Sequence, residues 1–490
     1  MEKSTLIEIL RTFSKEELAN FSDFVTSPYH NKKSNVTKLY KALRKQAPDF
    51  TPAKITKEEM WKHIFPGKKY NYGIMKNLIY DLNKLAVKFL ELEMYSQKQF
   101  DNDLNQLDAF KLKNLRPQFI KKSAESRKNL EAQPLDNQTY YRRYMLNCSE
   151  MSLFDYNSRR FRYHFDEINE SLALFYYTNQ LYHNTNSVGI SFFVSLPIDK
   201  EAHTSIIERY ENCAYKDPYA DVLKFSYLAQ SGEGSKEDYE KLKKVFFENY
   251  KKCAKTVQHD LATLMVNFCM NNARRGNSQF AEEGSIYIKL IMEDELYKAG
   301  TFVRIDQYQF VRYVVSECSE GRFDRAEKFI KEHSHELPED MREQFTNYSY
   351  ISLYQGRGRF KEALHYISKC RKADDVDRLN LKMFEFISYY ELGYYDELKA
   401  LADSTNHMLR TDKLFSTKEK TYNKNYIKVI SWLMDYKYKV GSRYKDPDFL
   451  PNIINFVNKN EMRYKLWLLR KIDELKNNES KITESKAAQS

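Results

Sequence analysis

The chain has 490 residues, 42% of them apolar and 15% aromatic, with only 13 Gly and 11 Pro to interrupt regular structure. This length and composition indicate an all-α chain of two or three domains or one elongated array, with no convincing train of alternating strands. The net charge is +11, and residues 1–100 supply +7 of it, from 18 Lys and Arg against 11 Asp and Glu.

Cysteine usage and hydropathy bear on the compartment. The six cysteines are scattered and include no Cys-x-x-Cys pair, which excludes a disulfide framework and the common zinc motifs. Residues 1–11 alternate charged and apolar side chains at helical spacing and lack the apolar run of a signal peptide. The most apolar short stretch, 188–198, is too short to span a bilayer. We therefore expect a soluble, cytoplasmic protein with no membrane insertion.

Residues 1–95 are expected to form a basic N-terminal helical domain. Two capping boxes, Ser14 with Glu17 and Thr56 with Glu59, mark helix starts within it. A long helix is expected from Tyr72. Its predicted core-facing stripe follows helical spacing and consists of Ile74, Leu78, Leu82, Leu85, Phe89 and Leu92.

A helix after Ser34 presents Lys38, Lys41 and Lys45 on one face. These lysines are candidate phosphate contacts, because each neutralised phosphate adds a salt-dependent increment to nucleic-acid affinity. Two blander explanations stand beside this one. Charge on an amphipathic helix is usually its solvated face, and the joint richness in Lys, Asn, Tyr, Phe and Ile is what AT-rich coding produces. Nucleic acid is therefore a possible partner but not the favoured one.

The middle region, 96–215, contains shorter helices punctuated by Pro117 and Pro134. One long amphipathic helix is expected from about residue 155 to 183. Its predicted apolar face consists of Phe161, Phe165, Ile168, Leu172 and Phe175.

Three similar turns recur between residues 302 and 410. They begin at Gly321, Gly358 and Gly393, which are 37 and then 35 residues apart. Each Gly follows an apolar-periodic helix and can take the left-handed conformation that ends it. A period of this length, joining two amphipathic helices at each turn, indicates a helical solenoid, because each pair exposes an apolar face that only its neighbours can cover.

The hairpin pattern extends beyond these three units. First helices are expected to begin near residues 217, 256, 301, 339 and 376, with upstream turns at 231–235 and 273–277. Helical repeats with C-terminal capping helices would then occupy 216–475. Residues 476–490 are polar and lack apolar periodicity, so we expect a disordered tail there.

The turn motif resembles that of the tetratricopeptide repeat family. It consists of the turn glycine, an aromatic residue two positions on and a small residue five positions on, which is Ala326 or Ala363 in two units and is replaced by Leu398 in the third. The sequence also resembles an uncharacterised group of bacterial helical-repeat proteins, which implies no activity. The resemblance implies stacked hairpins forming an α-solenoid, and the alternative is hairpins packed without a true superhelix.

No catalytic, cofactor-binding or metal-binding signature is present in the sequence. The segment 66–73 has glycines and lysines in the wrong order for a phosphate-binding loop. In the segment 332–336 the two histidines lie two positions apart, so they would point to different faces of a helix. We therefore expect no enzyme activity and no cofactor.

The leading hypothesis is a non-enzymatic scaffold that binds another protein or a peptide. The resemblance implies that the first helices of the repeats line a peptide-binding groove. The matching candidate partner-binding positions are Tyr308, Phe345, Tyr348, Ser352, Gln355, Met383 and Tyr390, and several of them could instead pack between repeats. The alternative is a nucleic-acid-associated regulator whose repeats sense a peptide or protein. The sequence specifies no oligomeric state.

Overall fold

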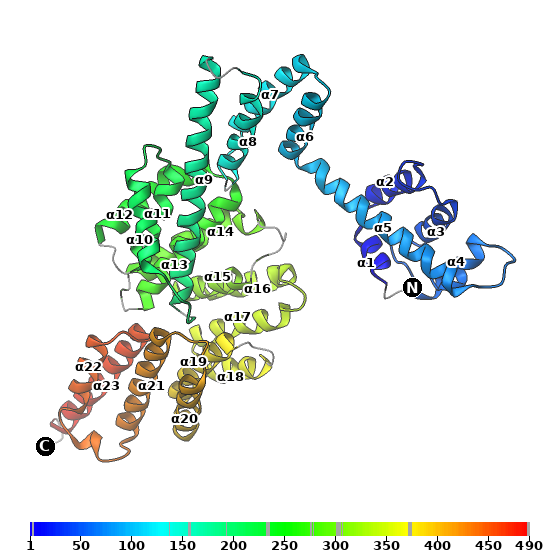
Figure 1. Cartoon of the computed structure of the whole chain (residues 1–490). Helices are drawn as coiled ribbons and strands as arrows, with labels where there is room; N and C mark the ends of the chain where they lie inside the picture. Colours follow the sequence, from blue (N-terminus) through cyan, green and yellow to red (C-terminus); the bar gives the residue numbers. More distant parts are fainter. Residues whose placement is uncertain are drawn as a thin grey trace. The chain divides into compact units, whose positions relative to one another are not determined.

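The protein is all-helical. The structure, a computed structural model, describes residues 1, 4–136, 138–154, 158–192, 194–231, 236–274, 277, 279–299, 305, 307–370 and 375–487. Within these residues the regular elements are 23 α-helices and short 3₁₀ turns, with two isolated β-bridges and no strand (Figure 1). The all-α prediction is confirmed. The chain divides into two compact units, Met1–Leu130 and Glu131–Ser490, so the first unit continues well past the predicted boundary at residue 95.

The first unit is built around one long helix. Its helices are α1 (Thr5–Thr12), α2 (Lys15–Thr26), α3 (Ser34–Arg44), α4 (Lys57–Ile64), α5 (Tyr72–Gln97), α6 (Gln99–Leu112) and α7 (Arg116–Glu131). Helices α1, α2 and α3 pack against α5. Phe21 lies at the centre of their shared core, with its ring 4.8 Å from that of Tyr40 and 5.2 Å from that of Phe89.

Both predicted helix starts in this unit are capped. The Ser14 backbone N–H donates to Glu17 Oε2 at 2.7 Å, and the Glu17 N–H donates to Ser14 Oγ at 3.1 Å, so the capping box is complete. At α4 the Glu59 N–H donates to Thr56 Oγ1 at 3.2 Å. These local bonds satisfy backbone donors that a helix start leaves without intrahelical partners.

The predicted core stripe of α5 is wrong by a rotation of the helix. The residues it buries are Met75, Leu78, Leu82, Ala86 and Phe89. Ile74 and Leu92, which were expected inside, are 46% and 36% exposed. The helix carries a second apolar row beside the buried one, and only the packing of α1 to α3 decides which row faces inward.

The second unit begins with α8 (Thr139–Met151), α9 (Arg159–Ser191) and α10 (Lys200–Asn212). Helix α9 packs against α8, α10 and α11. Its predicted apolar face is also wrong, because Phe165 and Leu172 are about half exposed and the buried positions include His164, Leu174 and Leu181.

Helical hairpins follow α10. They are α11 (Pro218–Ser231) with α12 (Lys236–Asn249), α13 (Lys255–Arg274) with α14 (Gln279–Glu293), α15 (Gln307–Ser319) with α16 (Phe323–His333), α17 (Arg342–Gly356) with α18 (Phe360–Lys369), and α19 (Asp375–Leu392) with α20 (Tyr395–Thr411). From α14 to α19 each second helix also packs against the first helix of the next hairpin. This stacking, visible in Figure 1, fits a helical-repeat solenoid. The predicted turns at 231–235 and 273–277 fall largely outside the described residues.

The three repeat turns share one backbone geometry. Gly321, Gly358 and Gly393 have φ of +74°, +72° and +76°. At the first turn the Gly321 N–H donates to the Cys318 carbonyl and the Arg322 N–H to the Glu317 carbonyl, at 3.1 and 2.9 Å, and the other two turns repeat this pattern. This is the Schellman motif, in which a left-handed residue ends the helix. The predicted left-handed glycines are confirmed.

Three further helices complete the unit. They are α21 (Thr417–Tyr438), α22 (Phe449–Lys459) and α23 (Lys465–Ala487), with α21 and α22 both packed against α23. Helix α23 continues through most of the segment 476–490, where the sequence predicts a disordered tail.

Candidate functional site

The largest well-lined cavity of the second unit lies where the repeat helices meet the start of α23. It offers about 430 Å³ and is lined from α13, α14, α15, α17, α19 and residues 463–470. We call it the groove cavity. Its walls therefore come from segments up to two hundred residues apart in the sequence, held together by the stacked hairpins.

Much of the cavity wall is apolar. Val311 and Val315 on α15 face it together with Phe384 on α19. The ring of Phe384 lies 5.3 Å from that of Tyr348 in an edge-to-face contact, which joins α19 to α17. Such a wall can take an apolar side chain or a ring.

The charged groups that line the cavity are all cationic. They are Arg312, Arg463, Lys465 and Arg470, and no Asp or Glu among the described residues lines it. Arg312 donates from Nη2 to Asn267 Oδ1 at 2.9 Å, which orients its guanidinium beside the cavity. The positive potential of such a set favours an anionic group on whatever enters.

Arg463 is buried and ties three elements together. Its guanidinium donates to Asn380 on α19 and, at 3.2 Å, to Asn423 Oδ1 on α21, and it lies 3.7 Å from Glu419 Oε1. Burial opposes the charge of Arg463, but its neighbours Tyr464 and Glu419 raise its pKa above the ordinary value. The residue therefore stays cationic and holds the start of α23 against the repeats.

Lys465 is the first residue of α23. Its Nζ donates to the Asn458 and Asn460 carbonyls, both at 3.2 Å. Burial lowers the pKa of Lys465 although Glu461 nearby opposes the shift. Arg470, one helical turn and a half further on, is exposed at the mouth of the cavity.

The structure distributes the seven predicted partner-binding residues between surface and core. Tyr348 lines the groove cavity. Tyr308 is 47% exposed, with its ring 5.5 Å from that of Phe345. Gln355 donates from Nε2 to the Phe384 carbonyl at 2.8 Å and to Ser388 Oγ at 2.9 Å, so it connects α17 to α19. The buried members are Phe345, Ser352, Met383 and Tyr390. The binding role of the seven stays a prediction.

The cationic lining is what sequence reasoning missed. Arg463, Lys465 and Arg470 belong to the segment interpreted from the sequence as a cap on the end of the array. Trp467 gave the one usable signal, because a Trp on a capping helix needs a partner surface, and its ring lies 5.2 Å from that of Tyr390.

The predicted phosphate contacts lie together on the first unit. Lys38, Lys41 and Lys45, at the outer face and end of α3, are all exposed. None of the three takes part in an ion pair within the described part of the chain. Their role in binding phosphate stays a prediction.

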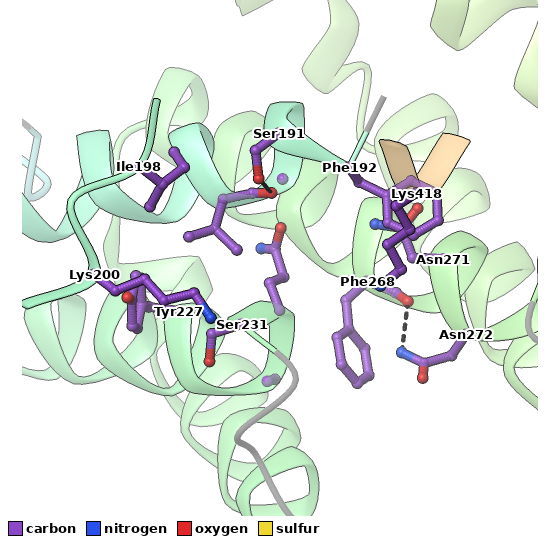
Figure 2. A pocket seen from close by; sticks show the side chains of 14 residues that line it. Ser191, Phe192, Ile198, Lys200, Tyr227, Ser231, Phe268, Asn271, Asn272 and Lys418 are labelled. Atoms are coloured by element: carbon purple, nitrogen blue, oxygen red, sulfur yellow. Dashed lines mark hydrogen bonds between the residues drawn. The ribbon is translucent and has the colours of Figure 1, made fainter. Parts of the chain in front are cut away.

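A second, smaller cavity of about 200 Å³ lies among α9, α11, α13 and the start of α21 (Figure 2). Figure 2 shows Lys200 and Lys418 reaching it from opposite sides. Both amide atoms of Gln230 are buried there without a protein partner, and a Cβ on Gly189 would lie 2.7 Å from Gln230 Oε1. The cavity suits a small polar molecule, and glycine at position 189 leaves room for the Gln230 side chain.

Metal and membrane sites were sought in the same coordinates. The described residues contain no group of three or more His, Cys, Asp or Glu arranged to hold a metal ion. In the segment 332–336, His333 Nδ1 instead lies 2.7 Å from Glu336 Oε1 as a local pair. None of the helices, as far as they are described, has the length and apolar character needed to cross a bilayer.

The fold and the groove cavity together define an all-helical protein of stacked hairpins with a cationic, partly apolar cavity. Comparison with protein families finds no match for this sequence, and no curated protein or solved structure matches it either. The function is therefore argued from the cavity itself.

Proposed function

We propose that this protein is a non-enzymatic interaction scaffold of helical-repeat type that holds an extended, acidic peptide segment of a partner protein in the groove cavity. The single observation that carries the proposal is the lining, which combines an apolar wall with four cations and no carboxylate among the described residues. The tetratricopeptide-like turns support it, since solenoids commonly present ligand surfaces along their first helices.

The chemistry of the lining specifies the segment. An apolar side chain would enter between Val315 and Phe384, where it loses contact with water. An acidic side chain beside it would meet Arg312 or Arg470, and arginine binds carboxylate through two parallel hydrogen bonds. The partner segment should therefore carry Asp or Glu close to a large apolar residue.

The free cysteines support a reducing compartment. All six are unpaired thiols, as expected of a protein that works in the cytoplasm. A cytoplasmic location is part of the proposal and would be tested by fractionating the native cells.

Selection of short random peptides on the immobilised full-length chain tests the proposal. Wild-type protein should enrich peptides that pair acidic with apolar residues. The variant Val315→Trp fills the cavity with a ring and should enrich none of them, whereas Lys361→Glu on the exposed surface of α18 should select the same peptides as wild type. Enrichment of neutral peptides, or of the same peptides by Val315→Trp, would overturn the assignment.

A further inference from the structure

The two units carry very different charge. Residues 1–130, the first unit, contain 25 Lys and Arg against 15 Asp and Glu, a net charge of +10 out of +11 for the chain. The second unit, residues 131–490, contains 54 against 53 and is nearly neutral. If excess lysine came from coding bias alone, it would be spread over both units. Its concentration in one compact unit indicates a surface for a polyanion.

Exposed tyrosines alternate with lysines on the long helix of this unit. Tyr72, Lys76, Tyr80 and Lys84 follow one another at intervals of four residues along α5, and all four are exposed. We call them the α5 strip. Residues four apart lie on neighbouring turns, so the strip presents ring, cation, ring and cation in order along the helix.

The rings of the strip are open to solvent. Tyr72 is 56% and Tyr80 58% exposed. Each has an ammonium group near its ring: Lys57 Nζ lies 4.6 Å from the centroid of Tyr72, and Lys84 Nζ lies 4.8 Å from that of Tyr80. A flat ligand can stack on such a ring while the lysine beside it turns to a neighbouring anion, because exposed contacts of this kind are weak.

Carboxylates close to the strip are already paired. Asp81 lies 2.8 Å from Lys33 Nζ at the start of α3, and Glu91 lies 2.8 Å from Lys88 Nζ. The first of these pairs brings the start of α3 beside α5 and adds a further lysine to the same surface. The positive potential over the strip is therefore not cancelled by its own helix.

We propose that the α5 strip is a binding surface for single-stranded nucleic acid, with bases stacked on Tyr72 and Tyr80 and phosphates held by Lys76 and Lys84. Aromatic rings and cations in alternation match the alternation of bases and phosphates in a single strand. In a duplex the bases are stacked on one another and offer no face to an isolated tyrosine. The surface therefore favours single strands, without reading their sequence.

Fluorescence anisotropy of a labelled oligothymidylate with the full-length chain at low salt tests this proposal. Tyr72→Ala/Tyr80→Ala should weaken binding at least about tenfold, while Tyr72→Phe/Tyr80→Phe should retain it, because phenylalanine still stacks. Lys76→Gln/Lys84→Gln should lower the slope of log affinity against log salt by about 0.7 for each lysine.

The controls remove equal charge elsewhere. Lys38→Gln/Lys41→Gln on α3 and Lys361→Gln on α18 should weaken binding less than the α5 pair, and circular dichroism should show an unchanged helix content in every variant. The proposal is overturned if no oligonucleotide binds, if duplex or anionic vesicles bind better than the single strand, if the alanine variant binds as wild type, or if the α3 pair has the larger effect.

Discussion

Two kinds of glycine shape the repeats at the scale of single residues. The turn glycines Gly321 and Gly358 have positive φ with no atom within 4 Å of an added Cβ, so they are required by conformation alone. Gly356 lies inside helix α17, where a Cβ would stand 2.7 Å from Cε1 of Phe323 in the preceding hairpin. Phe323 is the aromatic residue of the first turn motif. Its function is thus to pack against the next repeat.

Gly356→Ala should therefore destabilise the protein, by about 1 to 2 kcal/mol, although alanine is the better helix former. Phe323→Leu in the same chain should recover part of the loss, because it removes the ring that clashes. Gly321→Ala serves as a comparison and should cost about 1 kcal/mol from backbone strain only. Urea unfolding measures all three, and stabilisation by Gly356→Ala would show that the ring does not lie there.

Buried thiols give a second test at this scale. Burial raises the pKa of Cys253 and of Cys269 to about 12 each. At pH 8 only about one part in ten thousand of such a thiol is the reactive thiolate. Both should resist Ellman's reagent in the native protein and react at once in guanidinium chloride. Equal reaction rates for all six cysteines in the native state would contradict this packing.

The start of α23 is held by one charged network at the scale of elements. Arg463 supplies hydrogen bonds to Asn380 and Asn423, and Asn423 in turn donates to Glu419 Oε1 at 2.9 Å. The network joins α19, α21 and α23, and it fixes one wall of the groove cavity. Removing the cation alone would leave the Glu419 carboxylate buried without its charge partner, which is costly.

Arg463→Met should thus lower the free energy of unfolding by about 3 kcal/mol. Glu419→Gln/Arg463→Met should lose distinctly less, because the neutral amide needs no cation. Chemical denaturation of both variants and of Glu419→Gln alone completes the double-mutant cycle. Strictly additive losses would mean that Arg463 and Glu419 do not interact.

The turns could be predicted from the sequence because their determinants are local. A glycine that ends a periodic run fixes its own φ, so Gly321, Gly358 and Gly393 are found where the sequence predicts them. The inward faces of α5 and α9 could not be predicted in the same way. Each of these helices has two apolar rows, and the choice between them is made by helices distant in the sequence.

The groove cavity shows the same limit more strongly. Tyr348 was predicted from its place on a first helix, but Arg463 and Arg470 come from the last helix of the chain and its approach. Nothing in the local sequence around them indicates that they meet α15. Only the stacking of the hairpins over the whole unit brings these cations beside Val315.

At the scale of the whole molecule, buried tyrosines and cysteines set the response to alkali. Burial raises the pKa of Tyr40 to about 12, and burial with the Asp435 carboxylate raises that of Tyr395 to about 12. Their neutral forms are favoured by folding, so the stability they contribute is present below the unfolded pKa, near 10, and is lost as the pH rises towards 12.

The free energy of unfolding should accordingly be nearly constant from about pH 8 to 9 and fall above that, because the unfolded chain then binds fewer protons than the folded one. Cys253 and Cys269 add to the same trend, since their ordinary pKa is 9.0. Urea titrations at successive pH values measure it, with tyrosine absorbance as a second signal. Stability that rises above pH 10 would contradict the burial of these groups.

The two proposed surfaces divide the molecule by function. The basic first unit would hold single-stranded nucleic acid, and the nearly neutral second unit would hold a peptide. Each claim stands without the other, since their residues lie in different units.

The most direct test of the central claim is the dissociation constant of one selected acidic and apolar peptide for the full-length chain, with and without Val315→Trp, by isothermal titration calorimetry. We predict at least about tenfold weaker binding by the variant, because the ring occupies the space that the apolar side chain must enter. The unfolding midpoint should stay close to that of wild type, as Val315 is only half-buried. Equal affinity of the two proteins, with the fold intact, would show that the groove cavity does not hold the peptide.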